Sequence, residues 1–317
     1  MGQTLSEPVT LKETSVCEGG GYRVAVSSMQ GWRVTMEDAH TALPALPGDP
    51  HTAFFAVFDG HGGSSIAQHC SRQLHRSVMA RPEYGRGNLT IALQQGYLDL
   101  DAAMLQDPQL KDEMAGSTAI ACLITKREIY CANVGDSRAV ASVCGQTVEL
   151  STDHKPCLPK EKERIEAAGG WVEVNRVNGN LALSRALGDF VFKKNLSKPA
   201  HEQVVTAFPD VSIHELTEDW EFVVLACDGI WDVMTSQEVI QFVRCRLAMQ
   251  EAPEEVCESL INRCLAPDCQ MGGLGCDNMT VTIVCCVGGL TWRQFQEKCS
   301  RKSQQPDLDS YNDHDLT

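Results

Sequence analysis

The feature that most constrains the fold is a short apolar run that stops abruptly at an aspartate. Residues 53–63 read AFFAVFDGHGG, so Asp59 ends the run and His61 stands among glycines. A short apolar run bounded by turn residues is typical of a buried strand. The sequence therefore predicts a carboxylate and an imidazole at the end of a rigid, buried element, which is a suitable support for a reactive site.

The rest of the chain alternates between strand and helix patterns. Runs rich in Val, Ile, Phe and Tyr predict strands, and apolar residues spaced along one helical face predict helices. The predicted strands are 22–27, 53–58, 117–125, 128–134, 139–143, 211–216, 222–227 and 279–287, and the predicted helices are 64–79, 88–105, 160–168, 236–249 and 253–265. The turn at 135–137 is expected to close a hairpin. This order favours a sandwich of sheets flanked by helices over a regular βαβ wheel.

The chain divides into a short arm, one large folded part and a tail. Three glycines at 19–21 separate a polar arm, residues 1–21, from a folded part that is expected to begin near Tyr22. Residues 151–201 are more polar and less regular than their surroundings. After residue 290 we expect one short helix within 291–302, followed by an acidic tail, residues 304–317, that is too poor in apolar residues to fold.

Composition excludes several classes of protein. The 317 residues are 43% hydrophobic, which is enough for a substantial core, and their net charge of −15 opposes binding to nucleic acid or to an anionic membrane. The 15 cysteines include no C-x-x-C pair, so neither a disulfide framework nor a structural zinc site is indicated. We expect reduced cysteines and a cytoplasmic or nuclear protein.

The N-terminus offers one route to a membrane. No apolar run approaches the roughly 20 residues that span a bilayer, and the basic and apolar regions of a signal peptide are missing. The opening MGQTLS nevertheless fits the pattern for myristoylation of Gly2. An acylated and an unmodified terminus both stay open. A single acyl chain would attach the protein only weakly and reversibly.

Acidic residues recur where the predicted strands end. Any one of them is ordinary, because aspartate commonly ends strands and begins turns. Together, many beside glycine, they predict a shared polar cleft, whose carboxylates would repel one another unless cations neutralised them. Oxygen ligands favour Mg²⁺ or Mn²⁺ over zinc, and a pair of such ions can activate water for attack on phosphorus. The acids are Glu37, Asp38, Asp59, Asp136, Asp228 and Asp277.

Two basic side chains lie close to these acids in the sequence. His61 can donate a proton near neutral pH, and the alternative is a turn histidine that bonds to the backbone. Arg33 can hold a phosphate by two parallel hydrogen bonds, and the alternative is a surface ion pair. Residues 62–64 could also cradle a phosphate at a helix N-terminus, although no Walker lysine accompanies them.

Eight motifs, in order, resemble those of one known family. GWRVTMEDAH, FFAVFDGHGG, GSTAIACLI, ANVGDSRAV, LSTDHKP, LALSRALGDF, VVLACDGIWDVM and CDNMTVTIV look like the metal-dependent serine/threonine protein phosphatases of type 2C, the PPM family, over residues 22–290. The resemblance implies an α+β fold, a four-layer αββα sandwich in which two antiparallel sheets are flanked by helices. It also implies a two-metal centre between the sheets and a variable flap at about residues 155–201.

The resemblance implies a role for each candidate residue. Asp59 would bridge two Mg²⁺ or Mn²⁺ ions, and Asp38 would order metal-bound water. Glu37 and the carbonyl of Gly60 would bind one of the ions, Asp228 and Asp277 would bind the other, and Asp136 with Asp228 would hold a weaker third ion. Arg33 would bind the substrate phosphate, and His61 would be the general acid for the leaving oxygen.

The expected activity is hydrolysis of phosphoserine and phosphothreonine in proteins by a metal-activated bridging water, without a covalent phosphoenzyme intermediate. The sequence matches the pattern H-C-x₅-R at residues 69–76, but this match falls inside the predicted helix 64–79 and not in a loop that could supply a thiolate nucleophile. One alternative is a metal-dependent nuclease, which the acidic charge opposes. Another is a scaffold that binds phosphoproteins without turnover, which intact ligand positions oppose. The resemblance implies a monomer.

Overall fold

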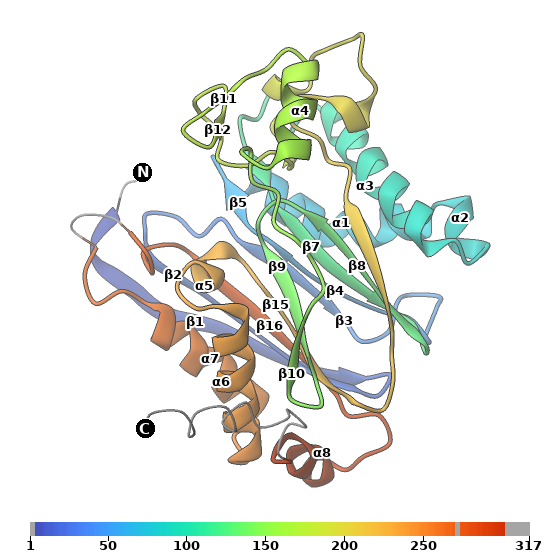
Figure 1. Cartoon of the computed structure of the whole chain (residues 1–317), viewed down its shortest axis with the longest axis vertical. Helices are drawn as coiled ribbons and strands as arrows, with labels where there is room; N and C mark the ends of the chain where they lie inside the picture. The colour runs from blue at the N-terminus through green and yellow to red at the C-terminus, as the bar shows by residue number, and fades with distance from the viewer. Residues whose placement is uncertain (1–3, 270–272, 302–317) are drawn as a thin grey trace, which may run out of the picture.

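Two antiparallel sheets packed face to face form the centre of the molecule, and helices cover both outer faces (Figure 1). The structure is a computed structural model that describes residues 4–269 and 273–301. The arrangement is the α+β, four-layer sandwich expected from the sequence. None of the helices in these two ranges is both long and apolar enough to cross a membrane.

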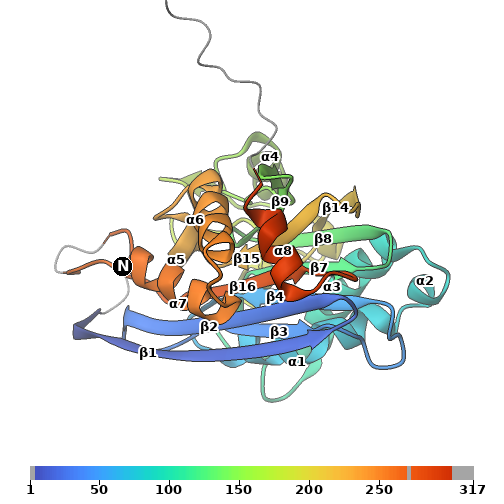
Figure 2. The same ribbon diagram turned by 90° about the horizontal axis from the view of Figure 1, so that it is seen from below.

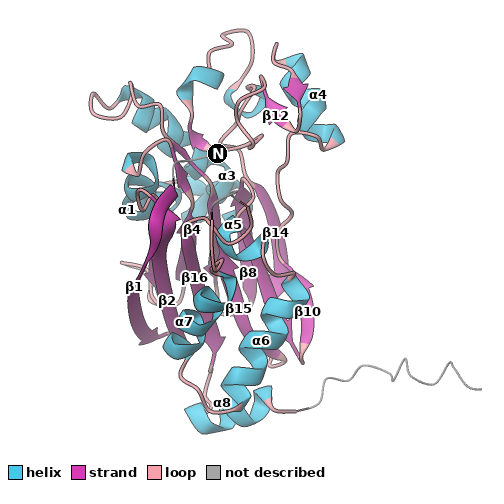
Figure 3. Cartoon of the chain, turned by 90° about the vertical axis from the view of Figure 1, so that its left-hand side faces the viewer, coloured by secondary structure: helices cyan, strands magenta, loops and turns pink. Residues whose placement is uncertain are grey.

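The first sheet has six strands in the order β1, β2, β16, β15, β9, β10. The outer face of this sheet packs against helices α6 and α7, and Figure 3 shows both running along it. Short helices α5 and α8 complete the layer. The elements are β1 (Thr4–Gly19), β2 (Tyr22–Arg33), β9 (Arg138–Val143), β10 (Gln146–Glu149), β15 (Trp220–Ala226), β16 (Met279–Cys286), α5 (Asp228–Trp231), α6 (Ser236–Ala248), α7 (Pro253–Cys264) and α8 (Trp292–Cys299).

The second sheet has five strands in the order β14, β8, β7, β4, β3. Helices α1 and α3 cover its outer face, and the short α2 connects them. The elements are β3 (Ala39–Leu43), β4 (Ala53–Phe58), β7 (Ala119–Ile124), β8 (Glu128–Val134), β14 (Asp210–Glu215), α1 (Ser65–Met79), α2 (Pro82–Gly85) and α3 (Leu89–Gln106).

Strand β4 shows why its sequence is apolar at every position. Phe54 and Phe58 pack into the core under α1 and α3, whereas Phe55 and Val57 pack into the core between the two sheets. Successive side chains of a strand point to opposite faces, so a strand covered on both sides needs apolar residues throughout. The predicted buried strand is confirmed, and it holds Asp59 at its carboxyl end.

The predicted hairpin at residues 135–137 is wrong. Strand β8 belongs to the five-stranded sheet, and β9 belongs to the six-stranded sheet. The Gly-Asp-Ser turn therefore carries the chain from one sheet to the other, with Gly135 in a positive-φ conformation (φ 104°). Because the turn crosses between the sheets, Asp136 lies at the cleft and not at the tip of a solvent-exposed hairpin.

The expected boundary near Tyr22 is also corrected, because the described part of the arm belongs to the sheet. Residues of β1 pair with β2, and the glycines at positions 20 and 21 form the two-residue turn between them (Figure 2). The hydroxyl of Thr14 donates to Glu258 of α7 at 2.7 Å. Strand β1 is an edge strand in which no residue is fully buried, so its sequence lacks an apolar pattern. Gly2 and the 304–317 tail lie outside the described residues.

The expected flap stands at one end of the sandwich, above the strand ends (Figure 1). It contains α4 (Pro159–Ala167), β11 (Val172–Glu173) and β12 (Arg176–Val177), and it has a small core of its own. Strand β13 (Leu187–Gly188) joins the flap to the sandwich, because it pairs with β6 (Gly116–Ser117), which in turn pairs with β5 (Gly60–His61).

The expectation that every cysteine is reduced needs one correction. Cys269 and Cys276 form a disulfide, with their Cα atoms 5.9 Å apart, which lies within the normal range for this bond. Both sulfurs pack beside Trp32 at the end of β2. The other cysteines are free thiols, and most of them are buried as expected.

Candidate metal centre

One cleft of about 700 Å³ collects the acids and bases singled out in the sequence. They come from the ends of strands in both sheets, and the flap contributes part of the wall. Asp38 does not line the cleft but lies beside Asp59, and of the candidate residues only Gly2 falls outside the described part of the chain. The candidate residues that line the cleft are Arg33, Glu37, Asp59, Gly60, His61, Asp136, Asp228 and Asp277.

The backbone of Asp59 is held on both sides by Thr118. The amide of Asp59 donates to Thr118 Oγ1 at 3.0 Å, and the amide of Thr118 donates to the carbonyl of Asp59 at 2.9 Å. The same hydroxyl shares a hydrogen bond of 2.7 Å with Ser137. Thr118 therefore couples Asp59 to the turn that carries Asp136, a connection that the sequence did not reveal.

Glu37 reaches the centre because two other residues accommodate its backbone. A Cβ on Gly60 would lie only 2.3 Å from the carbonyl oxygen of Glu37, so this approach requires glycine. The amide of Glu37 donates to Asn278 Oδ1 at 2.9 Å, and Asn278 Nδ2 donates to the carbonyls of Gln30 and Thr35. Asn278 stands beside Asp277 in the motif CDNMTVTIV and was not identified as a supporting residue.

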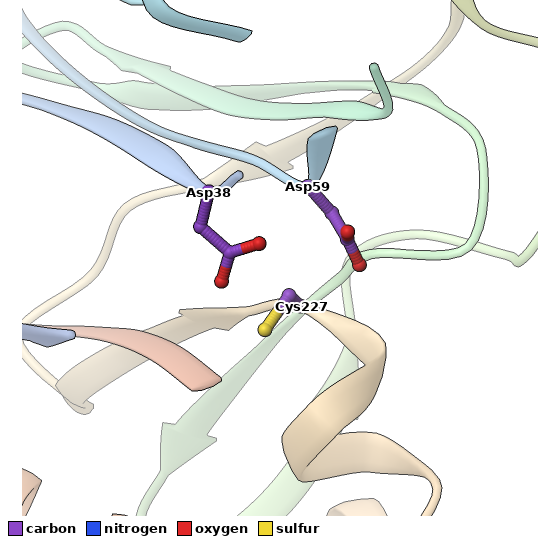
Figure 4. Close-up of side chains that lie close together, drawn as sticks. All are labelled: Asp38, Asp59 and Cys227. Atoms are coloured by element: carbon purple, nitrogen blue, oxygen red, sulfur yellow. The ribbon is translucent and has the colours of Figure 1, made fainter. Parts of the chain in front are cut away.

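Asp38 presents an oxygen that lacks a partner. Its Oδ2 accepts a hydrogen bond of 2.7 Å from Thr280, whereas Oδ1 is buried without a hydrogen bond among the described residues. Asp38, Asp59 and Cys227 each offer an atom within 4.8 Å of the others (Figure 4). Burial, with the charges of Asp277 and Glu37, raises the pKa of Asp38 to about 7.

Cys227 belongs to the framework and is not a ligand for a hard cation. Its sulfur accepts from the amide of Thr280 at 3.2 Å and donates to the carbonyl of Asn278 at 3.6 Å. Burial raises the pKa of the thiol well above its ordinary range, and the nearby aspartates raise it further. Magnesium and manganese select oxygen ligands, so Cys227 is excluded from this group and the carboxylates of Asp38 and Asp59 are left to face a metal ion and its bound water.

The carboxylates of the centre destabilise one another when they are charged. Burial raises the pKa of Asp59 well above its usual value, and the charges of Asp228 and Asp38 add to the rise. Burial also raises the pKa of Asp228, followed by the charges of Asp136 and Asp277. Divalent cations relieve such repulsion, and a water bound to them could donate a hydrogen bond to the free oxygen of Asp38. The residues therefore fit an oxygen-coordinated metal centre.

Two basic side chains partly neutralise the acids. Arg33 forms an ion pair with Asp277, which brings the predicted phosphate-binding residue to the predicted metal-binding residue. Lys155 donates to Asp136 Oδ2 at 2.5 Å, and it comes from the LSTDHKP motif, where we assigned it no role. Lys155 therefore occupies one side of the carboxylate for which a third, weaker ion was expected.

His61 has a carboxylate partner that the sequence analysis missed. Its Nε2 lies 2.7 Å from Oδ2 of Asp189, the aspartate of the quoted motif LALSRALGDF. Burial lowers the pKa of His61, but the hydrogen bond and charge of Asp189, with the charges of Asp136 and Glu37, raise it above its ordinary value overall. The imidazole is thus set up to carry a proton at the edge of the acidic cleft.

Comparison with known proteins agrees with this arrangement. A family model described as protein phosphatase 2C matches residues 22–271. A probable protein phosphatase 2C of Caenorhabditis elegans is 59% identical over 95% of this chain and 85% of its own length, and protein phosphatase 2C homolog 2 of Schizosaccharomyces pombe is 48% identical over 91% and 80%. A solved phosphatase structure from Toxoplasma gondii is similar with a TM-score of 0.75 and 28% identity, covering 87% of this chain and 95% of that one.

Proposed function

The chain belongs to the protein phosphatase 2C family of serine/threonine protein phosphatases, and we propose that it hydrolyses phosphoserine and phosphothreonine by direct attack of water on phosphorus. The observation that carries this proposal is the convergence of carboxylates from both sheets with Arg33 in one cleft. Substrates in this proposal are phosphorylated proteins, and the enzyme acts as a monomer.

In this proposal, two sets of ligands share Asp59. Asp59 would contact both ions, Glu37 and the carbonyl of Gly60 would hold one, and Asp228 and Asp277 would hold the other. When bound, Mg²⁺ or Mn²⁺ would activate the attacking water and neutralise the charge that develops on the phosphoryl group. Asp38 supports this assignment, because its free oxygen can accept a hydrogen bond from that water.

The remaining groups act on the substrate. Arg33 binds the phosphate oxygens, and Asp277 orients its guanidinium. As water adds to phosphorus, the P–O bond to the serine or threonine breaks and its electron pair goes to the leaving oxygen. His61 gives that oxygen a proton, so the products are the free hydroxyl side chain and inorganic phosphate.

Several observations support a mechanism without a phosphoenzyme. No cysteine lines the cleft among the described residues. Cys227, the thiol nearest to the acids, is fully buried and holds its proton tightly. A thiolate is the nucleophilic form of cysteine, so this thiol is unsuited to attack phosphorus.

Hydrolysis of a phosphothreonine peptide with Mn²⁺, with chelator, and with Asp59→Ala tests the proposal. We expect chelation or the substitution to lower kcat/KM at least about 100-fold, because the ions contribute several kcal/mol to the transition state. Mn²⁺ should also raise the melting temperature of the wild type but not of the variant. Asp99→Ala, which removes an exposed carboxylate paired with Arg81, is the control and should behave as wild type. Activity that survives both chelation and Asp59→Ala would refute the metal mechanism.

A further inference from the structure

We propose that Asp189 is a positioning residue for the reaction, holding the imidazole of His61 so that His61 can protonate the leaving oxygen. The inference rests on the proposed function, since it requires His61 to be the general acid. It adds a residue from the segment that joins the flap to the sandwich to a centre that is otherwise built from strand ends.

The contact is created by a small three-stranded ladder. His61 of β5 pairs with Gly116 of β6, and Gly116 pairs with Gly188 of β13. Asp189 follows directly, and its amide donates to the carbonyl of Ala115 at 3.1 Å. The backbone pairing therefore brings two residues that are 128 positions apart to a side-chain distance of 2.7 Å.

Gly116 leaves the space in which the pair meets. A Cβ at this position would lie 2.3 Å from Oδ2 of Asp189 and 2.5 Å from Nε2 of His61. Any larger residue would therefore drive the two side chains apart. The strand between them passes directly beside the hydrogen bond and shields it from one side.

The backbone of Asp189 has an unfavourable conformation. Its φ is 49° and its ψ is 40°, in the left-handed region that L residues seldom adopt, although aspartate and asparagine tolerate it better than most. Its side chain is 5% exposed, and the imidazole is its only side-chain hydrogen-bond partner among the described residues. Strained residues of this kind persist where the surrounding structure imposes them, and functional sites are frequent examples.

The hydrogen bond between His61 and Asp189 determines which nitrogen of the imidazole can donate a proton to the substrate. With Nε2 donating to Asp189, Nδ1 is the nitrogen left to carry the proton for the substrate. A carboxylate that accepts from one imidazole nitrogen fixes the orientation and tautomer of the ring, and hydrolases with a histidine–aspartate pair use the same principle. The His61 side chain is 30% exposed and lines the cleft, so its other edge is accessible.

Asp101 provides a matched control. It is a carboxylate of α3 that accepts from the amide of Gly188 at 2.8 Å and from Lys193 at 2.8 Å. It therefore supports the same ladder without contacting His61. A purely structural contribution of Asp189 should be reproduced by Asp101→Asn, whereas a contribution through His61 should not.

The test compares two substrates in His61→Gln, Asp189→Asn, Asp101→Asn and the double variant His61→Gln/Asp189→Asn, all saturated with Mn²⁺. A phosphothreonine peptide has a poor leaving group that needs protonation, and p-nitrophenyl phosphate has a good one that does not. We expect Asp189→Asn to lower kcat for the peptide about 10-fold to 100-fold, as loss of an orienting partner does, with KM unchanged. Its kcat for the aryl ester should change less than about twofold.

The double variant should be no slower than His61→Gln alone, because the two residues act as a unit. Asp101→Asn should affect both substrates equally. Equal losses on both substrates in Asp189→Asn, or losses that add to those of His61→Gln, would overturn the inference while leaving the general acid intact. Equal losses on both substrates in His61→Gln itself would instead overturn the role of His61 in the proposed function.

Discussion

Lys155 brings a positive charge to a cleft that otherwise gathers carboxylates. Its ammonium donates to Asp136, and burial would lower the pKa of the lysine were it not for the charges of Asp136 and Asp153, which raise it above its ordinary value. Asp136 is therefore compensated without a metal ion. A third cation at this carboxylate would have to displace the ammonium or share the carboxylate with it.

If Asp136 helps to hold a third, weaker ion, as the family resemblance implies, Lys155→Met should strengthen the binding of that ion. Removing the ammonium leaves Asp136 close to Asp228 without its counterion, and the added negative potential attracts a cation. We expect the affinity for the weakest Mn²⁺ ion to rise about tenfold, which corresponds to about 1.4 kcal/mol, in isothermal titration calorimetry. Lys160→Met, which removes an exposed lysine of α4, is the control. An unchanged weak site would show that Lys155 does not compete with a metal.

At the level of elements, a buried charge network anchors the flap. Glu161 of α4 accepts from Arg164 and Arg185 at 2.6 Å each, and from Ser184 at 2.6 Å. Arg185 also donates to Asp210 at the start of β14. The network therefore fastens α4 to the segment before β13, the strand that delivers Asp189 to His61. A buried pair of this kind is costly to break, because the remaining charges lose their partner.

Glu161→Gln should loosen the flap and destabilise the protein by about 3 kcal/mol at neutral pH. Burial alone would raise the pKa of Glu161, but Arg185 and Arg164 lower it to about 2. A carboxylate with a lowered pKa stabilises the fold above its unfolded pKa of about 4.3, and this stabilisation is lost as the pH falls towards 2. The difference between wild type and variant in urea unfolding should therefore shrink between about pH 4.5 and pH 2.

The exposed Glu163 of the same helix supplies the control, and Glu163→Gln should change stability by less than about 0.5 kcal/mol. Hydrogen exchange should accelerate in the flap of the Glu161 variant before it does so in the sheets. A difference between wild type and variant that is independent of pH would contradict the charge network as its source.

Individual elements also show how much of the fold can be predicted from sequence patterns. Strand β4 was predicted with its observed bounds because burial on both faces requires apolar residues at every position. Strand β1 was missed because an exposed edge strand needs no such pattern. The turn at Gly135 was misassigned because a turn sequence does not specify which sheet receives the next strand. Asp189 was missed as a site residue because its partner, 128 positions away, is brought to it by backbone pairing in an irregular segment.

On the scale of the whole molecule, the negative net charge of the protein opposes the approach of negatively charged substrates. The net charge is −15, while a phosphorylated peptide also carries negative charge. The local charges that would attract phosphate, Arg33 and the proposed metal ions, lie inside one cleft. Long-range repulsion therefore acts during approach, and short-range attraction acts only once the phosphate enters. These two effects differ in range, so salt can separate them.

Raising the salt concentration should increase kcat/KM for a phosphothreonine peptide with acidic flanks and decrease it for one with basic flanks. Between about 20 and 200 mM NaCl the Debye length falls to less than about 10 Å, which screens the overall field more than the contacts inside the cleft. We expect opposite changes of several-fold in the two peptides at saturating Mn²⁺. A peptide with neutral flanks is the control, because its kcat/KM reports any effect of salt on metal binding or on the hydrolysis step itself. Identical salt dependence of all three peptides would mean that the charge of the whole molecule does not influence substrate selection.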